Sequence, residues 1–351
     1  MKIYEHPLYQ EDIQNVSSLM LPWEKLQNSS LFISGATGLL GSFLVDVIMN
    51  KNFSEGLNCK IYALGRNENK AMARFAYCYH HPCFYFFTGD VNKPFKLPGV
   101  GKVGYVLHMA SNTHPMAYVT DPIGTIMTNL YGLKNMMDFA VAHNAERFAF
   151  ASSNEIYGEN RGDVEKFDEK YCGYIDCNTM RAGYPESKRC GEALCQAYIK
   201  QVNLDVVILR LTRSYGATML MSDTKAISQF LLKAIAGEDI VLKSQGTQYY
   251  SYTYVADAIS GVLTILLKGK NGEAYNIADN ASDIRLKDLA KLIANYCGRK
   301  VVFELPDEME KSGYSTATKA RLDSTKLQNL GWHSLYTIEE GIHRTIDILK
   351  D

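Results

Sequence analysis

The sequence lacks the features that define several classes of protein. None of its apolar runs is long enough to span a lipid bilayer, so no membrane partner is expected. Lysine and arginine are scattered, the net charge is −1, and no basic stripe indicates a nucleic-acid partner. The segment from Met1 to Asn15 is polar and carries acidic residues, which is not typical of a signal peptide. The chain also has no internal repeat and no low-complexity tract.

The eight cysteines show no regular spacing. This favours reduced thiols and therefore predicts a cytoplasmic protein. The densest group of candidate metal ligands is Cys78, His80, His81 and Cys83. A helix end and a turn before a strand would explain the same residues, and no second cluster has metal-ligand spacing. We therefore predict no metal site.

The most informative stretch runs from Leu31 to Gly41. A short apolar run ends in three glycines spaced three apart, and an apolar amphipathic segment, Ser42 to Met49, follows. In a strand–turn–helix unit such glycines permit a tight turn, close approach of a pyrophosphate and close packing of helix on strand. The helix N-terminus then offers free N–H groups to the phosphates. We interpret the stretch as a dinucleotide site, with a flexible loop as the alternative; the expected cofactor contacts are Gly35, Thr37, Gly38, Leu39 and Gly41.

Further apolar segments alternate with helical patterns after this stretch. They predict strands at residues 60–64, 84–87, 103–109, 147–151 and 205–211. Near-continuous apolar strands separated by helices are typical of a parallel sheet covered on both faces, so we predict a doubly wound, Rossmann-type α/β fold. After Arg213 the alternation breaks down, which indicates a smaller, interleaved C-terminal substrate lobe.

These patterns divide the chain into three parts. Residues 1–28 form an N-terminal extension, 29–212 a mainly dinucleotide-binding domain, and 213–351 a mainly substrate-binding lobe. Residues from about 252 to 278 are expected to return to the dinucleotide-binding domain. A length of 351 residues is enough for this organisation.

Tyr184 and Lys188 lie four residues apart, so on a helix they share one face. A nearby cation favours the phenolate and lowers the tyrosine pKa, which suits a base that removes a hydroxyl proton while hydride leaves the same carbon. The stretch from Ala151 to Gly158, just after the predicted fifth strand, carries serine hydroxyls that can bind the substrate oxygen. Tyr-x-x-x-Lys also occurs on surface helices, but its position about thirty residues past this stretch favours catalysis.

From about residue 29 to its end, the chain resembles the extended short-chain dehydrogenase/reductases, in the branch of nucleotide-sugar epimerases, dehydratases and decarboxylases. The resemblance depends on a combination of motifs. They are the glycine turn, Gly89-Asp-Val91, His108-Met-Ala-Ser111, Asn129, Ser152-Ser-Asn-Glu-Ile-Tyr-Gly158, Tyr184 with Lys188, Arg210 to Gly216, Tyr254-Val-Ala-Asp257, Arg321-Leu-Asp323 and Leu330-Gly-Trp332.

This resemblance implies a role for each motif. Tyr184 would be the base at the sugar C4 hydroxyl, Lys188 would lower its pKa and hold the nicotinamide ribose, and Ser153 would polarise the C4 oxygen. Hydride would pass to NAD⁺ and leave a 4-keto sugar, whose C5 proton is acidic. The cofactor contacts implied elsewhere are Asp90, at the adenine, and Val91, Met109, Ala110, Ser111 and Asn129.

The residues after Ser153 bear on the reaction type. Similar dehydratases carry Asp-Glu there, decarboxylases and some dehydratases carry Ser-Glu, and simple 4-epimerases usually lack the glutamate. This chain has Asn154-Glu155. We expect Glu155 to be catalytic and Asn154 to contact substrate, although Asn154 cannot donate a proton as an acid does. The prediction is a 4,6-dehydration or a decarboxylation, with 4-epimerisation as the alternative; a glutamate that only pairs locally stays open.

Substrate binding also departs from the family pattern. The arginine that usually precedes the Tyr-Val-x-Asp motif is replaced by Tyr250, and Arg213 replaces a phosphate-contacting asparagine. We hypothesise that Arg213 and Arg321 clamp the diphosphate while Tyr250 stacks or hydrogen-bonds nearby. A surface ion pair of Arg213 is the alternative. The missing arginine argues against a carboxylate-bearing substrate such as a glucuronate.

The cofactor is predicted to be NAD. NAD-selective sites usually place an acid at the end of the second strand, but this chain has Gly65-Arg66-Asn67. Arg66 could contact a 2′-phosphate, so NADP is an alternative, and with it a net NADPH-dependent carbonyl reductase. Enzymes that recycle their cofactor in place commonly use NAD. A sensor or scaffold on this fold is disfavoured because Tyr184 and Lys188 are both present.

The amphipathic segments 123–142 and 184–202 bear on oligomeric state. The family commonly pairs these two helices across a dimer axis. We therefore expect a homodimer, with simple packing of both helices on the sheet as the alternative.

Overall fold

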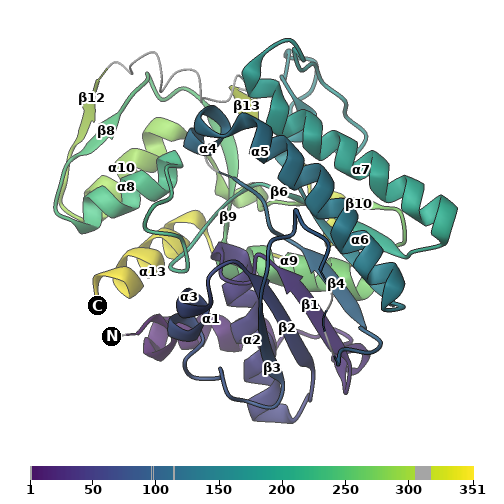
Figure 1. Cartoon of the computed structure of the whole chain (residues 1–351). Coiled ribbons are helices and arrows are strands. Elements are labelled where there is room, and N and C mark those ends of the chain that lie inside the picture. Colours follow the sequence, from purple (N-terminus) through teal and green to yellow (C-terminus); the bar gives the residue numbers. More distant parts are fainter. Residues whose placement is uncertain (1, 96, 98, 114, 305–317) are drawn as a thin grey trace.

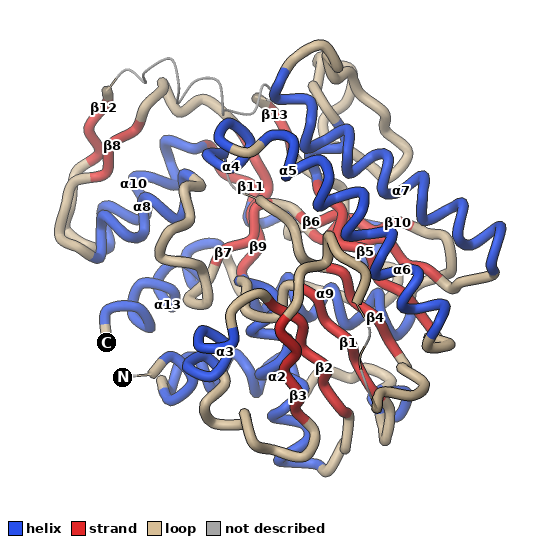
Figure 2. The backbone as a smooth tube through the Cα atoms, in the orientation of Figure 1, coloured by secondary structure: helices blue, strands red, loops and turns tan. Residues whose placement is uncertain are grey.

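A sheet of seven parallel strands runs through the centre of the molecule (Figures 1 and 2). This computed structural model describes residues 2–95, 97, 99–113, 115–304 and 318–351. The strand order is β10-β6-β5-β4-β1-β2-β3, and every neighbouring pair is parallel. The strands are β1 (Ser30–Ser34), β2 (Lys60–Gly65), β3 (Phe84–Thr88), β4 (Tyr105–His108), β5 (Arg147–Ser153), β6 (Val206–Leu211) and β10 (Ala274–Ile277).

Helices cover both faces of this sheet, because side chains alternate along each strand. Leu31 and Ile33 of β1 belong to one buried core and Phe32, between them, to the other. The first core also takes side chains of α1 (Pro7–Ser17), α2 (Leu39–Glu55) and α9 (Val255–Lys268). The second takes side chains of α6 (Leu133–Ala142) and α7 (Gly183–Val202). The predicted doubly wound α/β fold is confirmed.

Several shorter helices lie at the carboxyl ends of the parallel strands. They are α3 (Glu68–Arg74), α4 (Pro115–Thr120), α5 (Pro122–Met127), the π-helix η3 (Thr128–Gly132) and the 3₁₀ turns η4 (Asn154–Tyr157) and η5 (Met180–Ala182). The segment predicted as one helix over 123–142 is therefore α5, η3 and α6 in succession. The strand order reverses between β1 and β4, and open α/β sheets bind ligands at the carboxyl ends of the strands beside such a reversal.

The N-terminal extension contributes directly to the core. Helix α1 buries Tyr9 and Ile13 completely and packs on α2 and α9. Asp12, also buried, accepts hydrogen bonds from Arg344 at 2.8 Å and from Tyr254 at 2.5 Å. Because Arg344 lies on α13 (Ile338–Lys350), the two ends of the chain are joined, and Figure 1 shows both termini on the same side of the molecule.

The smaller lobe is built mainly from the chain after β6. One of its sheets contains β7 (Arg213–Tyr215), β9 (Tyr249–Tyr254), β11 (Asp283–Arg285) and β13 (Lys319–Ala320), and another contains β8 (Ile240–Leu242) and β12 (Val301–Phe303). Its helices include α8 (Ala226–Ile235) and α10 (Leu286–Tyr296), and α12 (Thr325–Gln328) follows β13. Between these elements the chain forms α9 and β10, and β10 is an edge strand of the large sheet. The predicted domain limits at 28, 212 and 252–278 stay predictions.

Two further observations concern membranes and metals. None of the helices in the part of the chain that the structure describes is long and apolar enough to cross a membrane. Within the same residues, no group of three or more His, Cys, Asp or Glu side chains is placed to hold a metal ion. The cluster of Cys78, His80, His81 and Cys83 lies in the turn between α3 and β3.

Candidate active site

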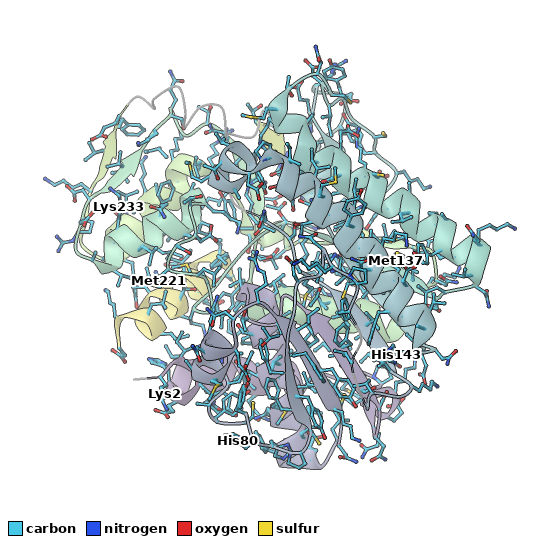
Figure 3. All side chains as sticks on the ribbon, in the orientation of Figure 1. Lys2, His80, Met137, His143, Met221 and Lys233 are labelled. Carbon is cyan, nitrogen blue, oxygen red and sulfur yellow. The ribbon has the colours of Figure 1, made fainter. Side chains whose placement is uncertain are left out.

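A cavity of about 1150 Å³ opens at the carboxyl ends of the parallel strands. One wall comes from residues that follow β1 to β6, and the other from α8, β8 and β9 of the smaller lobe. Lys233 of α8 lines it, and Figure 3 shows Lys233 on the smaller lobe. The cavity therefore lies beside the reversal of strand order, where this class of sheet binds its ligands.

The glycine turn forms the cofactor end of the cavity. Gly35 has φ +74°, and a Cβ there would lie 2.9 Å from the Ala110 nitrogen. A Cβ on Gly41 would lie 2.3 Å from the Gly35 carbonyl oxygen, so only glycine lets α2 start this close to β1. Thirteen of the predicted cofactor residues line the cavity: Gly35, Thr37, Gly38, Leu39, Gly41, Arg66, Asp90, Val91, Met109, Ala110, Ser111, Tyr184 and Lys188.

Asn129, by contrast, is fully buried behind the cavity wall. It lies in the π-helix η3, where its side-chain oxygen accepts from Ser111 at 2.7 Å and its amide donates to Ser187 at 2.8 Å. The Ser187 hydroxyl in turn donates to the backbone carbonyl of Tyr184 at 2.8 Å. Asn129 thus connects the loop after β4 to the first turn of α7 and positions the catalytic helix.

The predicted catalytic residues meet in the middle of the cavity. Ser153 ends β5, while Tyr184 and Lys188 lie one turn apart at the start of α7, and all three are buried. A hydrogen bond joins Ser153 to Tyr184. The Lys188 ammonium donates to the Ala151 carbonyl at 2.8 Å and lies 5.9 Å from the centre of the Tyr184 ring. Serine, phenol and ammonium are thus within reach of one substrate hydroxyl.

Burial shifts the pKa values of both Tyr184 and Lys188 toward their uncharged forms. The pKa of Tyr184 is raised, first by burial and then by the Glu155 carboxylate, although the Ser153 hydrogen bond opposes the shift. Burial lowers the pKa of Lys188 to about 7. The Lys188 ammonium is directed at the Ala151 carbonyl, and its lowering of the Tyr184 pKa stays a prediction. The phenol of Tyr184 is therefore protonated at neutral pH in this state.

Glu155 also lines the cavity and has a partner that the motifs did not indicate. Nη2 of Arg181 donates to its two carboxylate oxygens at 2.8 and 2.7 Å. The Arg181 guanidinium lies 4.7 Å from the centre of the Tyr118 ring, which stacks on the Tyr184 ring at 4.7 Å. Neither Arg181 nor Tyr118 belongs to a predicted motif. The available signal for Arg181 was its spacing, three residues before Tyr184.

The two arginines of the predicted clamp are separated. Arg213 lines the cavity with Asn154 and Tyr250, and its guanidinium lies 3.5 Å from the centre of the Tyr250 ring. Arg321 is not part of the cavity lining; it pairs with Glu165 at 3.3 Å and lies over Tyr249. Adjacent residues of a strand point to opposite faces, which places the arginines that stack on Tyr249 and Tyr250 apart in this structure. The clamp of Arg213 with Arg321 is wrong in this structure.

Comparison with known proteins matches this architecture to a described family. A model of the NAD dependent epimerase/dehydratase family matches residues 31–278. The chain belongs to that family. Two of its relatives are UDP-glucuronic acid decarboxylase 1 of Danio rerio, 29% identical over 318 residues, and UDP-glucuronic acid decarboxylase 5 of Arabidopsis thaliana, 28% identical over 320. These matches cover 90% of this chain in both cases and 71% and 87% of the relatives.

Solved structures show the same fold. DesIV, a dTDP-glucose 4,6-dehydratase of Streptomyces venezuelae solved with NAD, has a TM-score of 0.78 at 21% identity and covers 91% of this chain and 96% of its own. The UDP-glucose 4-epimerase of Thermotoga maritima has a TM-score of 0.77 at 20% identity, covering 91% and 98%. As a member of the NAD-dependent epimerase/dehydratase family, this chain is an enzyme with NAD as cofactor, which confirms both predictions.

Proposed function

We propose that this enzyme decarboxylates a nucleotide-linked uronic acid through transient oxidation at C4 of the sugar. Two observations support a nucleotide-sugar substrate: the relatives are UDP-glucuronic acid decarboxylases, and the cavity extends well beyond the cofactor end to the smaller lobe. When bound, NAD⁺ would supply the hydride acceptor and a positive charge that favours the phenolate of Tyr184. The other steps belong to residues of this chain.

Tyr184 would remove the proton from the C4 hydroxyl, and Ser153 would hydrogen-bond the same oxygen as it becomes a carbonyl. The carboxylate on C5 is then β to a ketone. The C5–C6 bond breaks, CO₂ leaves, and the bonding electrons pass into the C4 carbonyl to form an enolate. A proton from water would add at C5, and Tyr184 would give its proton back to the C4 oxygen as the ketone is reduced again, so that the cofactor undergoes no net change.

We favour decarboxylation over dehydration because of the contact between Arg181 and Glu155. Dehydration needs a free base for the C5 proton, but in this structure Arg181 donates hydrogen bonds to both oxygens of Glu155. Dehydration also needs an acid for the leaving hydroxyl, and Asn154 cannot serve as one. Decarboxylation needs neither group, because the electrons that form the enolate come from the C5–C6 bond.

Arg213 supports an anionic substrate. Its Nη1 is buried and has no hydrogen-bond partner within the described residues, so it can receive a phosphate or carboxylate oxygen. The family usually has an arginine on β9 at the position that Tyr250 occupies here. The Arg213 guanidinium stacks on Tyr250, so it lies close to where that missing arginine would be. The sequence argument against a carboxylate-bearing substrate is thereby weakened.

Mass spectrometry tests the proposal directly. The purified protein, without added cofactor, is incubated with nucleotide-linked uronic acids and the corresponding hexoses. Loss of CO₂ from a uronic acid, absent in Tyr184→Phe, is the expected result. Loss of water from a hexose would instead establish a dehydratase, and unchanged mass with altered retention an epimerase. Turnover only with added NADPH would indicate net carbonyl reduction.

We also propose a homodimer that pairs α5–η3–α6 and α7 across a two-fold axis. Three exposed apolar side chains, Ile123, Met127 and Tyr131, follow one another at intervals of four along α5 and η3. Ile123 is 73% exposed, and an exposed apolar stripe of this kind usually marks an interface. Light scattering should give twice the chain mass, and Ile123→Asp should give the monomer. A monomer before mutation would contradict the proposal.

A cytoplasmic location is the remaining proposal. All eight cysteines are free thiols, and Cys172, Cys177 and Cys190 are exposed. Exposed free thiols fit a reducing compartment. Cell fractionation of the tagged protein tests this, and recovery with secreted or membrane fractions would contradict it.

A further inference from the structure

Glu192 of α7 accepts a hydrogen bond from the residue next to the catalytic serine. The Ser152 hydroxyl donates to Oε1 of Glu192 at 2.6 Å, and Ser152 directly precedes Ser153 at the end of β5. Both serines line the substrate cavity, and Glu192 is not one of the described residues that do so. Glu192 can therefore influence the position of Ser153 without touching a substrate.

Arg210 fixes the Glu192 carboxylate from the neighbouring strand. Nε of Arg210 donates to Oε1 at 3.0 Å and Nη2 donates to Oε2 at 2.7 Å, so the pair is bidentate. Arg210 lies directly opposite Ser152 in the register of β5 and β6. Both side chains of the pair are mostly buried, with 14% of Glu192 and 11% of Arg210 exposed. The fork of the guanidinium therefore holds the carboxylate in one orientation against the two strands.

The same guanidinium also contacts the turn that follows Ser153. Nη1 of Arg210 donates to the Tyr157 hydroxyl at 2.9 Å, and Tyr157 is the last residue of η4. The pair of Glu192 and Arg210 thus contacts the chain on both sides of Ser153, through Ser152 before it and through Tyr157 after it.

Glu192 shares a helix face with the catalytic pair, because Tyr184, Lys188 and Glu192 lie four residues apart in succession along α7. Burial lowers the pKa of Lys188, and Cys195 and Glu192 oppose this shift. Burial raises the pKa of the Cys195 thiol, so at neutral pH the carboxylate is the charged member of these two neighbours. His108, whose own pKa is lowered by burial and by Lys188, is uncharged. The carboxylate that ties α7 to β5 is therefore also close enough to interact with the ammonium.

We propose that Glu192 is a positioning residue that sets the distance between Ser153 on β5 and Tyr184 on α7. A displacement of about 1 Å between reacting groups can lower a rate about a hundredfold, even when its cause lies away from the reacting atoms. The inference rests on the oxidation at C4 proposed above, a step common to decarboxylation, dehydration and epimerisation. It does not depend on which of these reactions follows.

Glu192→Ala removes the link between the two elements. On the nucleotide sugar that the unmodified enzyme converts, we expect kcat to fall about a hundredfold while KM changes by less than about threefold, because Glu192 does not contact the substrate. Glu192 and Arg210 also line a separate hollow of about 350 Å³, through which a small carboxylate can enter. Added formate should therefore pair with Arg210 and raise kcat of the variant by about tenfold.

Two further variants accompany the alanine change. Glu186→Ala is the matched control, since it removes an acid from the same helix whose pair with Arg189, at 3.1 Å, is partly exposed. It should change kcat by less than about twofold and should not respond to formate. Glu192→Gln serves where Glu192→Ala does not fold, because it keeps the side-chain volume and the acceptor for Ser152 but not the charge. We expect it to lower kcat by about tenfold, as for loss of a hydrogen bond to a charged group.

Hydrogen exchange followed by mass spectrometry gives a readout that needs no substrate. Peptides that cover residues 151–157 should exchange faster in the Glu192 variants and slow again with formate in Glu192→Ala, whereas Glu186→Ala should match the unmodified enzyme. The proposal is overturned if the Glu192 variants keep the kcat and the exchange of the unmodified enzyme, or if Glu186→Ala alters both as much. A sugar panel without any turnover would contradict the proposed function, and the exchange comparison would still decide the role of Glu192.

Discussion

Arg181 contacts Glu155 through a single nitrogen that lies between the two carboxylate oxygens, at 2.8 and 2.7 Å. Both side chains are mostly buried, with 12% and 19% of their surface exposed. In such a place, removing one partner leaves the other charge without compensation. The contact therefore joins Glu155 to the 3₁₀ turn η5, which leads directly into the helix that carries Tyr184.

Replacing Arg181 by alanine leaves the mostly buried Glu155 carboxylate without its cation beside Tyr184, and is expected to lower kcat/KM for the nucleotide-linked uronic acid by about a hundredfold. Arg181→Lys should recover part of this loss, because it keeps the charge but not the planar guanidinium. Steady-state kinetics measures the effect, with NAD affinity as a check that the cofactor end is intact. Arg161, which stacks on Tyr174 away from the cavity, gives the control Arg161→Ala. Equal activity of the two alanine variants would refute the role of Arg181.

Arg213 and Arg321 allow a second matched comparison, since each guanidinium lies over one of two adjacent tyrosines. Arg213→Ala is expected to weaken substrate binding by roughly tenfold to a hundredfold, the usual range for a hydrogen bond to a charged group. Arg321→Ala should change binding by less than about twofold, because its surface pair with Glu165 contributes little. Titration of the nucleotide diphosphate gives both values. A larger effect at Arg321 would restore the clamp hypothesis.

Lys188 makes stability depend on pH. Burial lowers its pKa from 10.5 to about 7, so below about pH 7 the cost of burying the ammonium is fully present. Between the two pKa values the unfolded chain binds a proton that the folded protein does not. The free energy of unfolding contributed by this group therefore rises with pH, by at most about 1.4 kcal/mol per unit.

Urea denaturation between pH 8 and 9.5 measures that slope. Lys188→Met should flatten it, whereas Lys102→Met, at an exposed pair with Glu146, should leave it unchanged. Identical slopes in all three proteins would show that Lys188 stays charged when folded.

Tyr9 tests the contribution of the N-terminal helix. Its ring is fully buried and its hydroxyl donates to Asp46, which also pairs with Arg74. Tyr9→Ala is expected to lower the free energy of unfolding by about 3 to 5 kcal/mol, as for other large aromatic side chains. Glu11→Ala, on the exposed side of α1, should cost less than about 1 kcal/mol. Similar losses from both changes would mean that α1 is not a core element.

Local patterns in the sequence predicted most of the fold. The apolar run and glycines from Leu31 to Gly41 specify strand, turn and helix within a dozen residues, and they also locate the cofactor end of the cavity. The Tyr184 and Lys188 spacing is likewise local to one helix. These features depend on neighbours in the chain, so they can be recognised without the structure.

The parts that were missed depend on contacts between distant residues. Arg181 and Glu155 are separated by 26 residues in the sequence. Arg181 belongs to no recognised motif, so the sequence does not indicate that the two side chains meet. Arg321 and Arg213 were predicted together because both are cations, but strand alternation on β9 places them at different tyrosines. The pKa of Tyr184 depends on burial and on Glu155, which residue spacing alone does not report.

The hydrogen bond between Asp12 and Arg344 spans 332 positions of the chain. At about 5 to 20 residues per second, a ribosome needs roughly 17 to 66 s to make the chain between them. During that interval Asp12 of α1 lacks the Arg344 guanidinium that compensates its buried charge. Helix α1 thus acquires this partner only after the intervening chain has been made, and the native arrangement of this core must wait for the synthesis of α13.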